Sequence, residues 1–156
     1  MGFLDRLLGR KRSDGKGLDS IYLRDPGLDD LKGKRASTSG DRLILYESGL
    51  RALLEARDGF IVFEEKDTGE RFVQFAADSS SVGLTGEVGS EAVSDEADQT
   101  LRDDLGFRPP DGSHPNYHRV FEEPDARALA ELMEKIFDTL GCPDTYTAEV
   151  VASQSH

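Results

Sequence analysis

Cysteine and tryptophan are almost missing from this sequence, whose 156 residues include one cysteine, Cys142, and no tryptophan. A single cysteine excludes an internal disulfide and a multi-cysteine zinc site, which fits a reducing compartment. Long apolar runs are missing too, since none approaches the roughly 18 residues that a membrane-spanning helix needs. We therefore expect a cytoplasmic protein.

Basic residues are scarce as well. The chain has 19 lysines and arginines against 31 acidic residues, which gives a net charge of -12. Affinity for a polyphosphate backbone depends on clustered basic side chains, so we expect no nucleic-acid partner. Hydrophobic residues make up only 37% and charged residues 32%. This composition predicts one domain flanked by segments that lie outside its core.

The chain divides into four parts by composition. Residues 1–12 are basic, residues 13–40 are rich in Gly, Ser, Asp and Lys, and residues 41–142 contain a succession of periodic apolar segments. We predict an N-terminal helix, a flexible linker, one domain and, over residues 143–156, a C-terminal arm.

The first twelve residues have an amphipathic pattern. Four large apolar side chains recur at helical spacing, beside four basic residues and one acidic residue. These apolar side chains are Phe3, Leu4, Leu7 and Leu8. The segment is not a secretory signal, because its basic residues follow the apolar ones. It is suited to contact with an anionic membrane surface or with a partner protein.

Two segments with apolar residues at helical spacing lie near the start and the end of the predicted domain. Apolar residues recur every three or four positions over residues 43–54, behind Asp41 as the N-cap, and Gly49 within this stripe indicates close packing. The second stripe runs over residues 129–140, with Pro124 in the first turn of its helix.

Strand-like runs and one shorter helix lie between these stripes. The predicted strands cover residues 60–64, 70–77 and 117–122, with an irregular, glycine-interrupted strand over residues 82–93. A helix over residues 95–105 begins at Ser94 and ends before Gly106. The short connections favour an antiparallel sheet with helices packed on one face, which is an α+β fold. Residues 146–151 fit either an edge strand or a disordered arm.

Catalytic signatures are weak. The glycines from Gly83 to Gly89 are spaced unlike a P-loop or a dinucleotide turn, and Cys142 follows a helix C-terminus, where the dipole disfavours a thiolate. His114 and His118 have a metal-ligand spacing for a helix, with Asp111 just before them, but Pro115 disfavours a helix there, so the two imidazoles need not converge. We expect no metal, no cofactor and no enzymatic activity.

Four short blocks resemble a family of actinobacterial proteins whose domain is similar to type III secretion chaperones. These blocks are Arg71-Phe72-Val73-Gln74-Phe75-Ala76, Ser90-Glu91-Ala92-Val93-Ser94, Leu105-Gly106-Phe107-Arg108-Pro109-Pro110 and Pro115-Asn116-Tyr117-His118-Arg119. The likeness covers residues 41–142. Phe107 replaces the family's usual tryptophan, and Asp95 replaces its usual asparagine. The resemblance implies an α-β-β-β-α-β-β-α fold, often dimeric, that binds peptides or partner proteins.

The leading hypothesis is therefore a non-catalytic, chaperone-like or adaptor domain that binds a protein or peptide client and forms a homodimer. Aromatic residues anchor many interfaces, and five of them are the predicted contacts, each with a place in the core as the alternative. These residues are Phe60, Phe72, Phe75, Phe107 and Tyr117. The second hypothesis is a peripheral regulator held at the inner face of the membrane by residues 1–12. A small enzyme that uses His114, His118 and nearby carboxylates is the third and least favoured.

Overall fold

The computed structural model describes residues 26–80 and 82–155. Its elements are η1 (Leu28–Asp30), β1 (Arg35–Ala36), α2 (Ser39–Ala56), β2 (Gly59–Glu65), β3 (Phe72–Ala77), β4 (Leu84–Val88), α3 (Asp95–Asp103), β5 (Tyr117–Phe121), α4 (Ala126–Thr139) and β6 (Ala148–Gln154). The strands form one six-stranded sheet in the order β1-β6-β2-β3-β4-β5, and every neighbouring pair is antiparallel. The predicted α+β class is confirmed.

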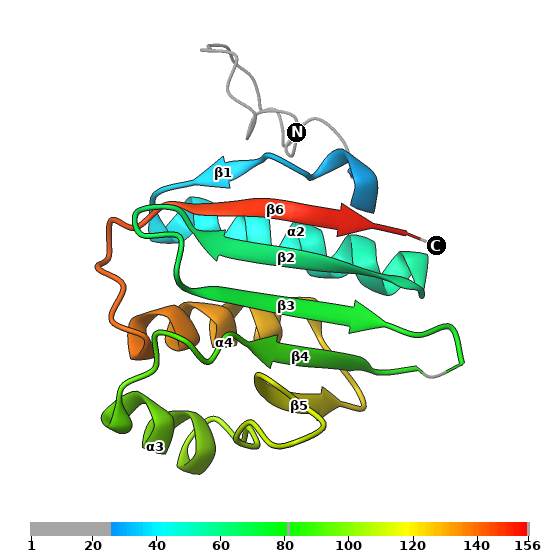
Figure 1. Ribbon diagram of the computed structural model, residues 1–156. Coiled ribbons are helices and arrows are strands. Elements are labelled where there is room, and N and C mark those ends of the chain that lie inside the picture. Colours follow the sequence, from blue (N-terminus) through cyan, green and yellow to red (C-terminus); the bar gives the residue numbers. More distant parts are fainter. Residues whose placement is uncertain (1–25, 81, 156) are drawn as a thin grey trace.

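Helices cover one face of this sheet. Figure 1 shows α2 and α4 side by side behind the strands, with α3 near the β5 end. Successive strand side chains point to opposite faces, so every second residue of β2 and β3 packs beneath the helices. Ile61, Phe63, Val73 and Phe75 are all fully buried on this side. The core therefore lies between the sheet and the pair α2 and α4.

Side-chain caps set where the helices begin. The Thr38 hydroxyl accepts a hydrogen bond from the Asp41 backbone N–H at 3.2 Å, so α2 begins two residues before the predicted cap. The predicted Ser94 cap of α3 is confirmed, since its hydroxyl accepts from the Ala97 N–H at 3.1 Å. The cap of α4 is Asp125, so Pro124 precedes the helix and does not lie in its first turn.

The C-terminal segment corrects the predicted boundaries. Strand β6 lies inside the sheet, paired with β1 on one side and β2 on the other, so residues 143–156 are not an arm outside the domain. Residues 28–36 also belong to the domain, because η1 and β1 lie within the predicted linker. Only Ala148 and Val150 of β6 are buried. Its apolar pattern is therefore too short to identify a central strand.

The strand count follows the residue runs, which predict one strand between the last two helices, and not the two strands that the resemblance implies. Strand β4 is regular and covers only Leu84–Val88. It has glycine at position 86 because two aromatic rings leave no room there for a side chain. A Cβ atom at Gly86 would lie 2.9 Å from Phe75 Cε1 and 3.0 Å from Phe121 Cε2. Within the described residues β5 is the single strand between α3 and α4, and the further strand follows α4 as β6.

Gly49 allows α2 to approach the sheet closely, as the sequence predicts. A Cβ atom there would lie 2.7 Å from Ile61 Cδ1 and 2.8 Å from Phe63 Cζ. We expect Gly49→Ala to lower the free energy of unfolding by about 1–3 kcal/mol, because overpacking outweighs the gain in helix propensity. Urea denaturation measures this change.

Gly40 provides the matched control for this substitution. It lies in the first turn of the same helix, and a Cβ atom there would have no heavy atom within 4 Å. Gly40→Ala should leave stability unchanged or raise it. A Gly49→Ala protein as stable as the Gly40→Ala protein would show that the approach of α2 to β2 is not tight.

Candidate functional site

The side of the sheet that α2, α3 and α4 leave uncovered is here called the open face. Its first row of neighbouring residues runs across four strands, from Phe60 through Ala76 and Thr85 to Val120. Ala76 is exposed and Val120 is 63% exposed. In Figure 1 this face is turned toward the viewer, and none of the labelled helices lies in front of it.

A second row lies beside the first. It runs from Val62 through Gln74 and Glu87 to His118, in the same register across the same four strands. Phe72 lies at the end of β3, where its ring packs over backbone: a Cβ atom at Gly89 would lie 2.3 Å from Phe72 Cε2. The open face therefore combines half-exposed apolar side chains with polar and acidic ones.

Acidic charge on the open face is only partly compensated. Arg35 lies 2.7 Å from Glu149, and Lys66 lies 3.5 Å from Glu64, so both carboxylates near the β1 edge have cationic neighbours. Glu87 instead accepts a hydrogen bond from the neutral Asn116 side chain at 3.0 Å. The centre of the face thus offers a carboxylate that a cationic ligand could pair with.

The five predicted aromatic contacts fall into two groups. Phe60 and Phe72 are half-buried on the open face. Phe75, Phe107 and Tyr117 are buried in the core, at 0%, 3% and 5% exposure, so a partner of the folded domain cannot rest on them. The prediction that these three form a contact surface is corrected, because they lie on the helix-covered side. Phe3, Leu4, Leu7 and Leu8 lie outside the described residues, and their contact with lipid or a partner stays a prediction.

The buried Tyr117 side chain links strand β5 to helix α3. Its hydroxyl donates a hydrogen bond to Asp98 Oδ1 at 2.5 Å, which joins β5 to α3. Burial, followed by this contact with the carboxylate, raises the pKa of Tyr117 to about 12. The same hydrogen bond lowers the pKa of Asp98 below its ordinary value. At neutral pH the Tyr117 hydroxyl therefore stays protonated and donates, while the Asp98 carboxylate stays charged and accepts.

Asp111, His114 and His118 meet at the β5 edge of the open face, where His118 ends the second row. The two imidazole rings are stacked, with centroids 3.9 Å apart and an angle of 17° between their planes. His114 Nδ1 lies 3.2 Å from Asp111 Oδ1. The expectation that the imidazoles need not converge is thus wrong, because a tight loop, and not a helix, brings them together. The spacing of these residues was the only signal in the sequence.

A hollow of about 510 Å³ lies beside the two histidines. Its lining residues are Gly106, Arg108, His114, His118, Arg119 and Val120. The Arg119 guanidinium is engaged on the helix side, where it donates to the Leu105 carbonyl at 2.7 Å and stacks over Phe121 at 4.5 Å. The volume of the hollow falls within the range of small-molecule sites, and the rings of His114 and His118 form part of its lining.

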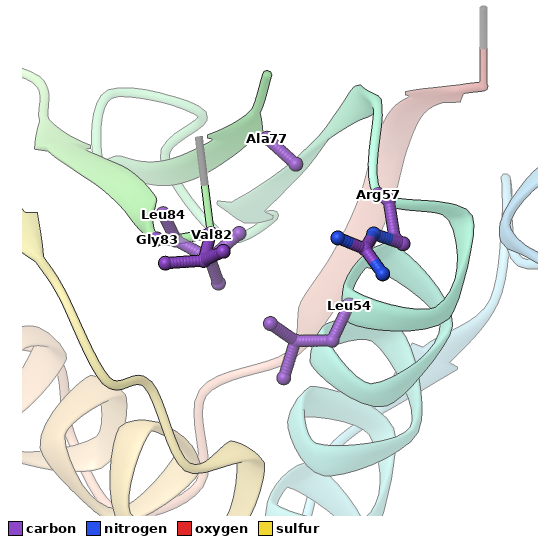
Figure 2. A pocket seen from close by; sticks show the side chains of 6 residues that line it. All are labelled: Leu54, Arg57, Ala77, Val82, Gly83 and Leu84. Atoms are coloured by element: carbon purple, nitrogen blue, oxygen red, sulfur yellow. The ribbon is translucent and has the colours of Figure 1, made fainter. Parts of the chain in front are cut away.

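A second, smaller pocket of about 260 Å³ lies at the opposite end of the strands. Figure 2 shows its lining side chains, with Leu54 and Arg57 at the end of α2 facing Val82 and Leu84 of the β3–β4 hairpin. Arg57 ends α2 in the left-handed conformation, at φ 61°. The pocket is smaller than the roughly 300–1,000 Å³ of typical ligand sites, so we do not assign it a ligand.

Cys142 does not offer a reactive thiol. It is 6% exposed, and burial raises its pKa to about 11. The thiol is therefore protonated at neutral pH, whereas a nucleophilic cysteine needs the thiolate. Its place at the end of α4 is that of a packing residue.

No helix in the described part of the chain combines the length and the apolar character needed to cross a bilayer. Comparison of the whole sequence with protein-family models and curated proteins, and of the fold with solved structures, finds no match.

Proposed function

We propose that this domain is a non-catalytic, adaptor-like module and that its open face binds a basic amphipathic segment of a partner protein. The observation that carries this proposal is the row from Phe60 to Val120, which is apolar at both ends and lies on a sheet face that α2 and α4 leave uncovered. Exposed apolar patches of this kind mark interaction surfaces in soluble proteins.

The row of half-exposed side chains favours an amphipathic segment. Half-exposed side chains of four strands lie side by side, so a segment can lay one apolar stripe across Phe60 and Val62 while its polar side remains in water. The hollow of about 510 Å³ touches this row only at Val120, the end of the row on β5.

Charge favours a basic partner. Glu87 lies in the second row of the face without a basic side chain paired to it in the described part of the chain. The chain as a whole carries a net charge of -12. Attraction of this kind accelerates association with cationic segments and weakens as salt is added.

Fluorescence anisotropy with two labelled peptides tests the proposal on the full chain. One peptide places Leu and Lys at helical spacing, and the other has Glu in place of every Lys. We expect only the Lys peptide to bind, less tightly at high salt. Val120→Lys should weaken binding about tenfold, the equivalent of 1.4 kcal/mol, because it removes apolar contact and adds repulsion. Val120 is exposed, so the substitution should leave the fold intact.

Glu87→Gln and Glu131→Gln form a matched pair for the charge effect. Both remove one carboxylate, but Glu131 is exposed on α4, away from the open face. Only Glu87→Gln should weaken binding. Equal loss in both variants, or equal binding of both peptides, would mean that the acidic chain attracts cations without a site. A dimer in light scattering that Val120→Lys dissociates would instead assign the open face to a second copy.

A further inference from the structure

We propose that Asp111, His114 and His118 bind one divalent transition-metal ion of the zinc class at the β5 edge. One candidate ligand atom from each of the three side chains lies within 4.8 Å of the other two. This site does not depend on the proposed function of the open face. It lies beside the hollow of about 510 Å³, which leaves room for water to complete the coordination of an ion.

The donor set selects the class of ion. Two imidazoles and one carboxylate are a common ligand set for Zn²⁺ and related first-row ions, whereas Mg²⁺ and Ca²⁺ prefer oxygen ligands alone. Three protein ligands with an open position are also typical of sites that keep bound water. The distance of 3.2 Å between His114 Nδ1 and Asp111 Oδ1 fits two atoms that share one ion, since ligands bound at about 2.0–2.2 Å stand roughly 3 Å apart.

His118 is already oriented as a ligand. It belongs to β5 and is 9% exposed, so its ring is held by the strand. Its Nδ1 lies 3.1 Å from the Asn116 carbonyl oxygen, an acceptor that requires the proton on Nδ1. In the neutral ring with this tautomer, Nε2 carries the lone pair that binds a metal ion. Metal-binding histidines are commonly fixed in this manner, by donation of the other ring N–H to a carbonyl.

The loop holds Asp111 in place by its backbone. Asp111 Oδ1 accepts from the Ser113 N–H at 2.8 Å and from the His114 N–H at 2.9 Å. The loop is closed by a hydrogen bond from the Asp111 N–H to the His114 carbonyl at 2.8 Å. The Asp111 carboxylate is thus positioned next to both histidines.

Binding of a metal ion requires the His114 ring to move. An ion binds imidazole in the plane of the ring, whereas the two rings are stacked face to face at 3.9 Å. The His114 side chain is 51% exposed, so its ring is free to tilt while that of His118 stays in place. Ion binding should therefore separate the stacked rings, and the ring proton signals of both histidines in NMR spectra should shift together.

Isothermal titration of the tag-free full chain with Zn²⁺ tests the site. We expect one ion per chain, and no comparable binding of Mg²⁺. His114→Ala and His118→Asn should each weaken Zn²⁺ binding at least about tenfold, because loss of a ligand costs no less than loss of a group that orients one. His156→Ala is the comparison variant, since His156 is the third histidine of the chain and is not one of the three proposed ligands. It should bind Zn²⁺ as the unchanged protein does.

Circular dichroism establishes that each variant is folded before the titration. His114 is largely exposed, so His114→Ala tests the site even if His118→Asn disturbs β5. An unchanged Zn²⁺ affinity in folded His114→Ala would overturn the proposal. Absence of stoichiometric Zn²⁺ binding, or loss of binding in His156→Ala alone, would overturn it as well.

Discussion

Arg42→Ala is expected to lower the free energy of unfolding by about 3–5 kcal/mol, the cost of leaving a buried ion pair without one partner. Arg42 is 1% exposed, and its guanidinium forms two hydrogen bonds with the Glu134 carboxylate, at 2.8 and 3.1 Å. It also donates to the carbonyl oxygens of Tyr146 and Ser37, at 2.8 and 3.1 Å. One side chain thus joins α2, α4 and the segment before β6.

Two tyrosines complete this buried network. The hydroxyls of Tyr46 and Tyr146 are 2.5 Å apart, and the Tyr146 hydroxyl donates to Glu134 Oε2 at 2.7 Å. Burial is the main cause that raises the pKa of each tyrosine above its ordinary value, so both hydroxyls stay protonated and able to donate. Among the hydrogen bonds described here, removal of Arg42 leaves Glu134 with the neutral Tyr146 hydroxyl, which does not balance its charge.

Arg51→Ala is the matched control on the same helix. Arg51 forms an ion pair with Glu47 one turn away, and its side chain is 52% exposed. Exposed pairs of this kind contribute about 0.3–0.5 kcal/mol. Chemical denaturation of both variants measures the difference. A loss in Arg42→Ala no greater than in Arg51→Ala would mean that the network does not hold the two helices together.

The sequence predicts those parts of the fold in which local pattern and tertiary packing agree. The stripe from Leu43 to Leu54 forms α2, the strand runs at 60–64 and 70–77 form β2 and β3, and Ser94 caps α3. In the helix and the two strands, the apolar residues repeat every 3.6 or 2 positions over enough residues to identify the side of the element that is buried.

The sequence is less informative where a contact joins distant segments. In the sequence Arg42 looks like an ordinary charged residue on a helix, because its partners Glu134 and Tyr146 lie 92 and 104 residues further along the chain. The meeting of His114 with His118 depends on a loop conformation that Pro115 does not reveal. The aromatic contacts show the same limit: alternation places Phe72 and Phe75, three residues apart on one strand, on opposite faces, but it does not say which face the helices cover.

A chain that ends at Thr147 is expected to lose the cooperative fold altogether, although the sequence pattern suggests a dispensable arm. The deletion removes β6, which pairs with both β1 and β2 inside the sheet. It also removes Ala148 and Val150, both of which are fully buried. The remaining chain would expose the edge of β2 and leave β1 without its neighbour. The loss therefore exceeds that of any single side chain.

A chain that ends at Gln154 is the control for this deletion. It lacks Ser155, which forms two hydrogen bonds with Asp29 at the surface, but it keeps every residue of β6. We expect its stability to fall by no more than about 1–2 kcal/mol, the contribution of two exposed hydrogen bonds. Near-ultraviolet circular dichroism and limited proteolysis distinguish the two chains. A cooperative unfolding transition in the shorter chain would mean that β6 adds to a sheet that is already stable, because only then could β2 remain as an edge strand.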